Sequence, residues 1–425
     1  MRSHYKRIGD YVTQIKLKNT DDSVSSLKGI NINKHFMPSV ANINGTDLSK
    51  YRVVKKNQFA FNPMHVGRDE VLPISMLEDD EPIIVSPAYV VFEVKDEEEL
   101  LPAYLMMWCR RSEFDRNAWF MTDNSVRGGF SWADFCDMEL PIPSIEKQRE
   151  IVREYNVVND RIALNEQLTQ KLEDTAQAIY QQWFVDFEFP ISKEYAESIG
   201  KPELEGKPYK SSGGEMKHCE ELEKNIPDGW SFGNLSDMSD LIDGDRGKNY
   251  PSKEQMKAQG YCLFLNTGNV TKKGFLFENL SFIDQERDSL LRKGKLQVND
   301  VVLTTRGTIG NVARFSSVTP YEHMRINSGM LIIRPKAEEY SGFIFSLLQS
   351  VEMKNKIESF LSGSAQPQLP IKDLVKINII RPDGGVILQL EDIINKITDN
   401  VDVIKNSQIQ LKNLSQIILQ RISKA

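Results

Sequence analysis

Apolar side chains recur at alternating spacings of four and three residues in two long segments of the chain. The first segment begins at Ser144, a good helix N-cap residue, and its repeating positions are Ile151, Tyr155, Val158, Ile162, Asn165, Thr169, Leu172, Ala176, Ile179 and Trp183. The second has Leu390, Ile394, Ile397, Val401, Ile404, Gln408, Leu411, Ser415, Ile418 and Ile422. This spacing is typical of coiled-coil helices, in which occasional polar positions fix the register.

Both predicted helices are long. About 40 residues at about 1.5 Å each make a rod of about 60 Å, which is longer than a single domain needs. A core helix in a compact bundle remains the alternative. The simplest pairing is antiparallel, because a duplicated chain can then place its two domains at opposite ends of one rod.

The rest of the chain repeats one plan. The three clearest internal sequence repeats pair residues 57–61 with 299–303, 85–91 with 326–332, and 125–143 with 364–382. Their separations are 242, 241 and 239 residues. A weaker repeat pairs 8–11 with 235–238, 227 residues apart, so the second copy carries an insertion of about 15 residues. Recurrence in the same order at a nearly constant separation indicates two similar domains.

Short β-branched and aromatic runs, separated by Gly, Pro and Asn, predict strands over 82–94, 301–305 and 330–334. Helices are predicted over 102–114 and 341–360. The predicted fold class is α+β, with two similar domains separated by two long helices that form an antiparallel coiled coil. The predicted segments are a first domain at 1–143, a central helical region at 144–190, a linker at 191–224, a second domain at 225–383 and a C-terminal helix at 384–425.

The composition is that of an ordinary folded protein. The 425 residues are 40% hydrophobic and 27% charged, which excludes wholesale disorder. No apolar run approaches the roughly 18 residues of a membrane span, and the N-terminus lacks the apolar core of a signal peptide, so we expect a cytoplasmic protein. The 4 cysteines and 5 histidines do not cluster at ligand spacings, which indicates reduced thiols and no metal site.

The net charge of −7 argues against indiscriminate nucleic-acid binding. The charge is unevenly distributed. Residues 225–382 carry 20 Lys and Arg against 17 Asp and Glu, or +3, whereas residues 1–142 carry 17 against 21, or −4. Any nucleic-acid surface must therefore be a local basic patch.

Two similar heads on a rigid spacer favour recognition of two sites at a fixed separation, as when a protein dimer reads two DNA half-sites. Glycine-containing loops supply side chains suited to phosphates and base edges. The candidate DNA contacts are Asn62, His65, Arg68, Ser125 and Arg127 in the first head, and Arg246, Lys248, Arg306, Thr308, Asn311, Ser364, Gln366 and Gln368 in the second. Each loop could also be a plain surface turn. Their recurrence at matching places, with different side chains, favours one binding edge that reads two different sequences.

Several stretches resemble a known family. Trp183–Phe187, 206–214 and 226–230 are similar to the central conserved region of type I restriction-modification specificity subunits. Residues 59–64 and 85–92 are similar to one kind of target recognition domain in that family. The resemblance covers essentially the whole chain.

The resemblance implies that the heads are two target recognition domains and that the helical regions pair and dock two methyltransferase (modification) subunits. Restriction subunits would join them. The complex would read a bipartite sequence in double-stranded DNA with an unspecified spacer, and would methylate adenines or cleave remotely. S-adenosylmethionine, ATP and Mg²⁺ would then be cofactors of the partner subunits, and this chain would hold none.

The chain lacks the motifs of a catalyst. A methyltransferase needs an N-P-P-[YF]-like motif, but Asn62-Pro63-Met64 has one proline and no aromatic residue. The glycine turn at 244–249 has the wrong spacing for an ATPase phosphate loop and ends in Asn. We therefore expect a non-catalytic DNA-recognition subunit. The competing classes are a coiled-coil scaffold with two protein-binding heads and a fusion that carries its own nuclease or methyltransferase, for which the missing motifs leave little room.

Overall fold

A computed structural model describes residues 5–39, 46–64, 66–122, 129–361 and 368–424, without the side chain of Arg68. The chain forms two compact units. Unit 1 consists of Met1–Leu164 and Gln408–Ala425, and unit 2 of Asn165–Ser407. Each unit therefore contains one head and part of each long helix.

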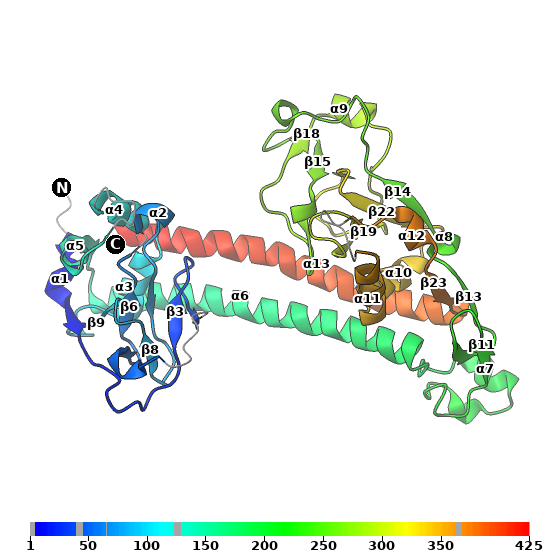
Figure 1. Ribbon diagram of the computed structural model, residues 1–425, viewed down its shortest axis with the longest axis horizontal. Helices are drawn as coiled ribbons and strands as arrows, with labels where there is room; N and C mark the ends of the chain where they lie inside the picture. Colours follow the sequence, from blue (N-terminus) through cyan, green and yellow to red (C-terminus); the bar gives the residue numbers. More distant parts are fainter. Residues whose placement is uncertain (1–4, 40–45, 65, 123–128, 362–367, 425) are drawn as a thin grey trace. The chain divides into compact units, whose positions relative to one another are not determined.

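The head of unit 1 is built on an antiparallel sheet in the order β2-β9-β6-β7 (Figure 1). Its strands are β2 (Val12–Ile15), β9 (Val90–Val94), β6 (Phe59–Phe61) and β7 (Ile74–Met76). Side chains alternate between the two faces of a strand, so Phe59 and Phe61 enter one core cluster and Ala60 enters another. The larger cluster includes the stacked rings of Phe59 and Phe92, whose centroids are 4.8 Å apart.

Smaller elements complete this head. Three antiparallel pairs join β1 (Tyr5–Arg7) to β10 (Glu139–Pro141), β3 (Lys28–Ile30) to β4 (Phe36–Pro38), and β5 (Arg52–Val54) to β8 (Ile83–Val85). The helices are α1 (Ile8–Tyr11), α2 (Val66–Asp69), α3 (Pro102–Cys109), α4 (Ser112–Met121) and α5 (Trp132–Asp137).

The head of unit 2 has the same strand order, β14-β22-β19-β20. These strands are β14 (Ser239–Asp243), β22 (Met330–Pro335), β19 (Val301–Thr304) and β20 (Val312–Arg314). Val301 and Leu303 enter one core cluster and Val302 another, as in the first head. The duplication predicted from the sequence is therefore confirmed in the topology.

Unit 2 repeats the flanking elements and has a larger second sheet. The repeated elements are the pair β13 (Ser231–Asn234) with β23 (Asn378–Arg381), and α8 (Leu235–Met238), α10 (Tyr340–Gln349), α11 (Val351–Phe360) and α12 (Ile371–Val375). The second sheet has the order β18-β15-β21, with β18 (Phe282–Ile283), β15 (Cys262–Leu265) and β21 (Met324–Ile326), the counterpart of β8, and α9 (Gln285–Leu290) follows β18 (Figure 1). A short hairpin joins β16 (Val270–Thr271) to β17 (Gly274–Phe275).

The duplication extends to single side chains. In unit 1, the Gln58 amide donates to Glu93 over 2.8 Å; in unit 2, the Asp300 carboxylate accepts two hydrogen bonds from Arg334, of 2.9 and 2.8 Å. Gln58 and Asp300 each also accept the backbone N–H three residues earlier. The same position therefore fixes the same turn and the same pair of strands in both heads.

A second pair of matching contacts supports this correspondence. Asn57 and Asn299 both adopt positive φ, 64° and 75°, at the turn before the equivalent strands. The ammonium group of Lys95 donates to carbonyl groups of α1, and that of Lys336 donates to a carbonyl group of α8. Each lysine ties the end of a central strand to the first helix of its head.

The long helices are α6 (Ile145–Tyr180) and α13 (Gly384–Arg421). The Ser144 hydroxyl accepts a 3.4 Å hydrogen bond from the N–H of Lys147, as its predicted capping role requires. In unit 1, Gln408 lies 3.4 Å from the carbonyl of Ile162, whereas Arg421 pairs with Glu154, further back along α6. The numbering rises on one helix as it falls on the other, which confirms the antiparallel pairing. In unit 2, Lys405 faces Glu173.

The predicted seam positions are covered to different degrees. The buried apolar ones are Ile151, Tyr155, Val158, Ala176, Trp183, Leu390, Ile394, Val401, Ile418 and Ile422. The half-buried ones are Ile162, Leu172, Ile179, Ile397, Ile404 and Leu411. The polar positions Asn165, Thr169 and Ser415 are buried as well. The seam therefore mixes apolar packing with polar contacts, as the sequence pattern predicts.

Three predicted elements are interrupted. The helix predicted over 102–114 is two helices, because Arg111 is extended, with a ψ of 144°. The helix predicted over 341–360 breaks at Ser350, whose hydroxyl accepts from the N–H of Met353 and caps the second piece. The strand predicted over 82–94 is broken by residues 86–89 between β8 and β9.

The segment predicted as a linker, 191–224, contains α7 (Lys193–Ser198) and β11 (Met216–Cys219), which pairs with β12 (Lys224–Pro227). Before it, α6 ends in a π-helical turn, Gln181–Val185, that buries Trp183 and Phe184. Phe189 stacks on Tyr209 at 4.6 Å and on Trp230 at 4.9 Å. The three stretches that resemble the central conserved region of the family thus meet in one aromatic cluster of unit 2. None of the described helices is long and apolar enough to cross a lipid bilayer.

Candidate nucleic-acid interface

Loops from four places in the sequence converge at one edge of the unit 2 head. They are residues 244–250 after β14, 266–269 after β15, 305–311 between β19 and β20, and 327–329 between β21 and β22. The N–H of Arg306 donates to the carbonyl of Gly329 over 3.2 Å, and the Thr308 hydroxyl donates to the carbonyl of Thr267 over 3.2 Å. These bonds give the edge a defined backbone shape.

The 305–311 turn depends on glycine and on a buried hydroxyl. Gly307 and Gly310 have φ values of 68° and 87°, which residues with side chains rarely adopt. The buried Thr304 hydroxyl accepts the N–H of Asn311 over 3.0 Å. The Asn311 amide in turn donates to the carbonyl of Val270 over 2.9 Å. Thr308 and Asn311, both predicted DNA contacts, therefore hold the loops together.

Arg306 and Gln368 present exposed side chains at this edge, and their backbones form an isolated β-bridge. Both residue types can pair bidentately with bases, Arg with guanine and Gln with adenine. The sequence placed them in separate loops 62 residues apart, 306 to 368. The structure brings them together.

Arg246 links the 244–250 turn to the same edge. Its guanidinium lies 3.3 Å from the carbonyl of Ser328, next to Gly329, and 3.8 Å from the carboxylate of Asp243. Lys248 is exposed two residues further on. Four predicted contacts of the second head, Arg246, Lys248, Arg306 and Gln368, therefore expose cationic or amide groups around these loops.

The first head offers fewer described candidates. The half-buried Asn62 accepts the N–H of Met64 over 3.0 Å and follows β6, as the 305–311 turn follows β19. The backbone of Arg68 lies in α2. His65, Ser125, Arg127, Ser364 and Gln366 lie outside the described residues, and their predicted contacts with DNA stay predictions.

Sequence reasoning missed the loops at 266–269 and 327–329. Their contribution is mostly backbone carbonyl groups, which no residue pattern reveals. Asn266 and Asn327 offered a signal, because each precedes a Gly by two residues, and an Asn side chain can accept the N–H two residues on in a turn. Both do so, from Gly268 and Gly329 at 2.8 and 2.9 Å.

The described residues contain no group of three or more His, Cys, Asp or Glu side chains placed to hold a metal ion. The buried thiols are unreactive in character: burial raises the pKa of Cys109 and of Cys262 to about 12. The chemistry of the edge is that of binding, through cations, amides and backbone groups.

The chain is similar in sequence to known DNA-specificity proteins. The type I restriction modification DNA specificity domain matches residues 227–414, which include all four converging loops. The chain is 24% identical over 428 aligned positions to the specificity subunit of the type I restriction enzyme HindI from Haemophilus influenzae, covering 91% of this chain and 89% of the relative. Residues 227–414 are thus similar to a DNA specificity domain, and most of the chain is similar to a type I restriction enzyme specificity subunit.

Two further proteins are similar to this chain. The specificity subunit of the enzyme MjaIX from Methanocaldococcus jannaschii is 22% identical over 286 aligned positions, covering 67% of this chain and 60% of the relative. The crystal structure of a type I restriction-modification S subunit from M. genitalium has a TM-score of 0.59 at 13% identity and covers 99% of this chain and 95% of that one. The latter likeness supports the fold, with two heads and a coiled coil.

Proposed function

We propose that this chain is a specificity subunit that directs a type I restriction-modification complex to a bipartite sequence in double-stranded DNA, with one head per half-site. The observation that carries the proposal is the pair of heads with one strand order and matching anchoring contacts but different loop residues. A common scaffold with different loops suits two readers of different sequences. The chain itself contributes recognition, and the methylation and cleavage chemistry belongs to its partners, which bind S-adenosylmethionine, ATP and Mg²⁺.

The helices are the proposed docking surface for two modification subunits, with restriction subunits joining the complex in the cytoplasm. Several large apolar side chains on α6 and α13 face solvent in this chain: Val157, Leu164, Leu168, Val403, Ile409, Leu414 and Ile417. Long helices with apolar side chains on the outside as well as in the seam are typical of elements that pack against further chains.

A domain exchange tests the division of labour. Replacing residues 1–142 with the equivalent head of another specificity subunit should change one half of the methylated sequence and leave the other half as it was. The measurement is genome-wide mapping of methylated adenine in cells that express the exchanged chain with its modification subunit. The matched control exchanges residues 225–382, which should change the opposite half.

Two outcomes would contradict the proposal. If one exchange altered both half-sites, the heads would not read DNA independently. If the wild-type chain directed no sequence-specific methylation and its complex bound all duplexes alike, a scaffold with two protein-binding heads would account better for the fold.

A further inference from the structure

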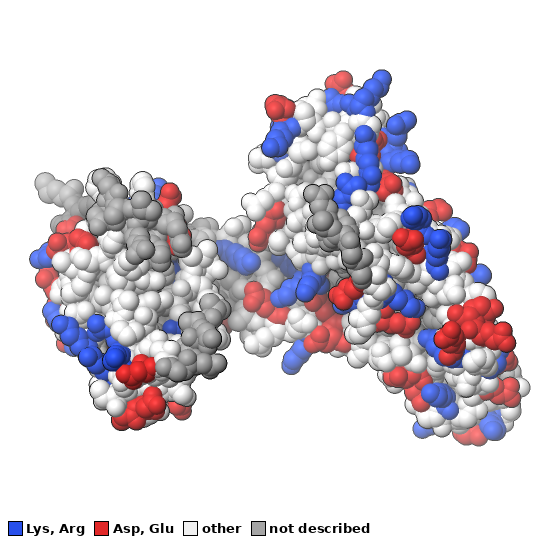
Figure 2. Space-filling model, in the orientation of Figure 1, with Lys and Arg blue, Asp and Glu red and all other residues white. Residues whose placement is uncertain are grey.

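Basic side chains gather at the end of unit 2 that carries α9 (Figure 2). Arg246, Lys248, Arg292 and Lys293 are exposed there. Arg246 and Lys248 lie in the turn after β14, and Arg292 and Lys293 follow α9, more than 40 residues later in the sequence. Asp284 and Glu286 at the start of α9 are exposed, but Asp245, the acidic residue within the two basic segments, is buried. The exposed charge of residues 244–250 and 291–293 is therefore positive.

Asp245 joins the two basic segments. Its carboxylate accepts the N–H of Gly247 over 2.7 Å and that of Arg292 over 2.8 Å. The hydrogen bond from Gly247, followed by that from Arg292, holds the pKa of Asp245 below its ordinary value, so the carboxylate is charged at neutral pH. Asn249 adds a second connection, because its amide donates to the carbonyl of Leu290 over 3.1 Å.

The segments also approach the recognition edge closely. A Cβ on Gly244 would lie 2.2 Å from the carbonyl oxygen of Asn327, and a Cβ on Gly294 would lie 3.3 Å from the Cα of Gly244. The separation at Gly244 leaves no room for a side chain, and Gly294 has a φ of 85°, which residues with side chains rarely adopt. The turn after β14, the loop after α9 and the 327–329 turn are therefore packed backbone against backbone.

A buried arginine fixes the loop after α9. The Arg325 guanidinium donates to the carbonyl groups of Asp288, Leu291 and Lys293 over 2.8, 3.0 and 2.7 Å. Arg325 lies in β21, directly before the 327–329 turn. One side chain thus sets the path of the backbone that carries Arg292 and Lys293.

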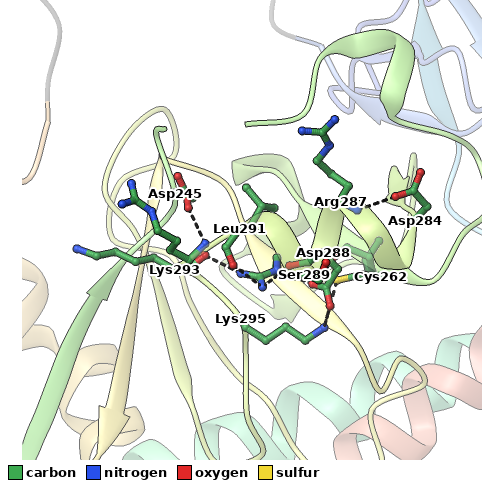
Figure 3. A network of polar contacts seen from close by, with 12 residues as sticks. Asp245, Cys262, Asp284, Arg287, Asp288, Ser289, Leu291, Lys293 and Lys295 are labelled. Carbon is green, nitrogen blue, oxygen red and sulfur yellow. Dashed lines mark hydrogen bonds and ion pairs between the residues drawn. The ribbon is translucent and has the colours of Figure 1, made fainter. Parts of the chain in front are cut away.

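The charge of this buried arginine is balanced internally. The Asp288 carboxylate accepts from Arg325 over 2.5 Å and from Lys295 over 2.7 Å, and Cys262 lies beside this pair (Figure 3). Burial alone would raise the pKa of Asp288, but the hydrogen bonds from Lys295 and Arg325 hold it below its ordinary value. Figure 3 shows the side chain of Lys293 directed away from this network. The network therefore stabilises the loop and leaves the charge of Lys293 available to solvent.

We propose that residues 291–293, the 291–293 arm, bind backbone phosphates of duplex DNA next to the half-site read by the second head, and that Arg325 is the residue that positions the arm. This inference rests on the proposed function and adds phosphate contacts to it. Arg and Lys contacts to phosphates supply affinity that does not depend on sequence and falls steeply with salt. A backbone fixed by Arg325 and Asp245 presents these charges in one place beside the base-reading edge.

The test uses the complex of the full chain with its modification subunits. The probes are a 40-base-pair duplex that contains the target found by methylation mapping and a 40-base-pair duplex of unrelated sequence, with binding measured by fluorescence anisotropy at several salt concentrations. The variant Arg292→Ala/Lys293→Ala should weaken binding to both duplexes by about ten-fold at 0.15 M salt, and should reduce the slope of log affinity against log salt by about two. The control, Lys201→Ala/Lys207→Ala, removes the same charge from exposed positions in the 191–224 segment and should leave the slope unchanged.

Arg325→Lys tests the positioning role while keeping the positive charge. A lysine cannot reach three carbonyl groups, so amide hydrogen exchange of residues 288–293 should accelerate and the salt slope should fall, while the preference for the target duplex remains. An unchanged salt slope in Arg292→Ala/Lys293→Ala would overturn the proposal that the 291–293 arm binds phosphates. A loss of affinity confined to the target duplex would also overturn it, because that result indicates contacts with bases. If the wild-type complex did not prefer the target duplex, the proposed function would be contradicted instead. The two failures can be told apart, because the salt slope on the unrelated duplex tests the arm without any sequence recognition.

Discussion

At the residue scale, equivalent positions in the two heads stabilise the same turn and the same strand pair with different side chains. Gln58 and Asp300 each hold a turn and bridge to the neighbouring strand, but Gln58 is a neutral amide and Asp300 a carboxylate paired with Arg334. The Asp300 side chain is 1% exposed and that of Arg334 24% exposed. The two positions therefore make equivalent contacts, and they differ mainly in that Asp300 forms an ion pair and Gln58 does not.

This pair gives a first prediction. Asp300→Ala should destabilise its sheet by about 3 kcal/mol, because Arg334 is left half-buried without its partner. Gln58→Ala should cost less, about 1.5 kcal/mol, because it breaks no ion pair and removes a hydrogen bond from a neutral amide to the Glu93 carboxylate. Hydrogen-exchange mass spectrometry of the full chain measures both locally, through the amides of β19 and β22 for Asp300 and of β6 and β9 for Gln58. Equal effects in the two sheets would show that the ion pair adds nothing beyond the hydrogen bonds.

At the scale of elements, the outer faces of the helices carry the proposed contacts with modification subunits. Leu414 and Ile417 are three residues apart on α13, so their side chains share one face, and they are 44% and 53% exposed. The double variant Leu414→Glu/Ile417→Glu should keep the seam but reduce binding of the modification subunit by at least ten-fold, because it places two charges in an apolar contact. Titration calorimetry with the purified subunit measures the affinity.

A matched control separates docking from net charge. Gln410→Glu/Gln420→Glu adds the same charge at exposed positions of α13 and should leave the affinity within about two-fold. Circular dichroism should show equal helix content in both variants. Normal binding by Leu414→Glu/Ile417→Glu would place the modification subunit on another face.

Elements also differ in how far the sequence predicted them. The long helices were predictable because their seams repeat locally, and the helix cap at Ser144 is confirmed. The breaks at Arg111 and Ser350 were not, because the apolar pattern continues through both of them. Arg246 and Arg306 were predictable as exposed loop cations, whereas the 291–293 arm was not. Its shape depends on a hydrogen bond that Asp245 accepts and on others that Arg325 donates, and these residues are 47 and 33 positions away from Arg292.

At the scale of the whole molecule, α6 and α13 are the segments that the two units have in common. If these helices set the separation of the half-sites, inserting one heptad after Leu164 and another after Ser407 should lengthen the DNA spacer by about three base pairs. Seven residues add about 10.5 Å and keep the seam in phase, and DNA rises about 3.4 Å per base pair. Mapping of methylated adenine measures the spacer directly.

Insertion of five residues at both places serves as the comparison. It rotates the following turns by about 140° out of phase, so the apolar seam should turn outward and assembly should be lost. An active heptad variant with an unchanged spacer would mean that the helices do not act as the ruler.

The chain enters and leaves each head through one pair of antiparallel strands, β1 with β10 in unit 1 and β13 with β23 in unit 2. The two junctions needed to exchange the head of unit 2 therefore lie on adjacent strands, with backbone hydrogen bonds between them. A foreign head whose two ends form the same antiparallel strand pair can therefore be joined to the rest of the chain at both junctions. Under the proposed function, crossing-over between related genes would combine new pairs of half-sites in a single step, without changes to the proposed docking surfaces on α6 and α13.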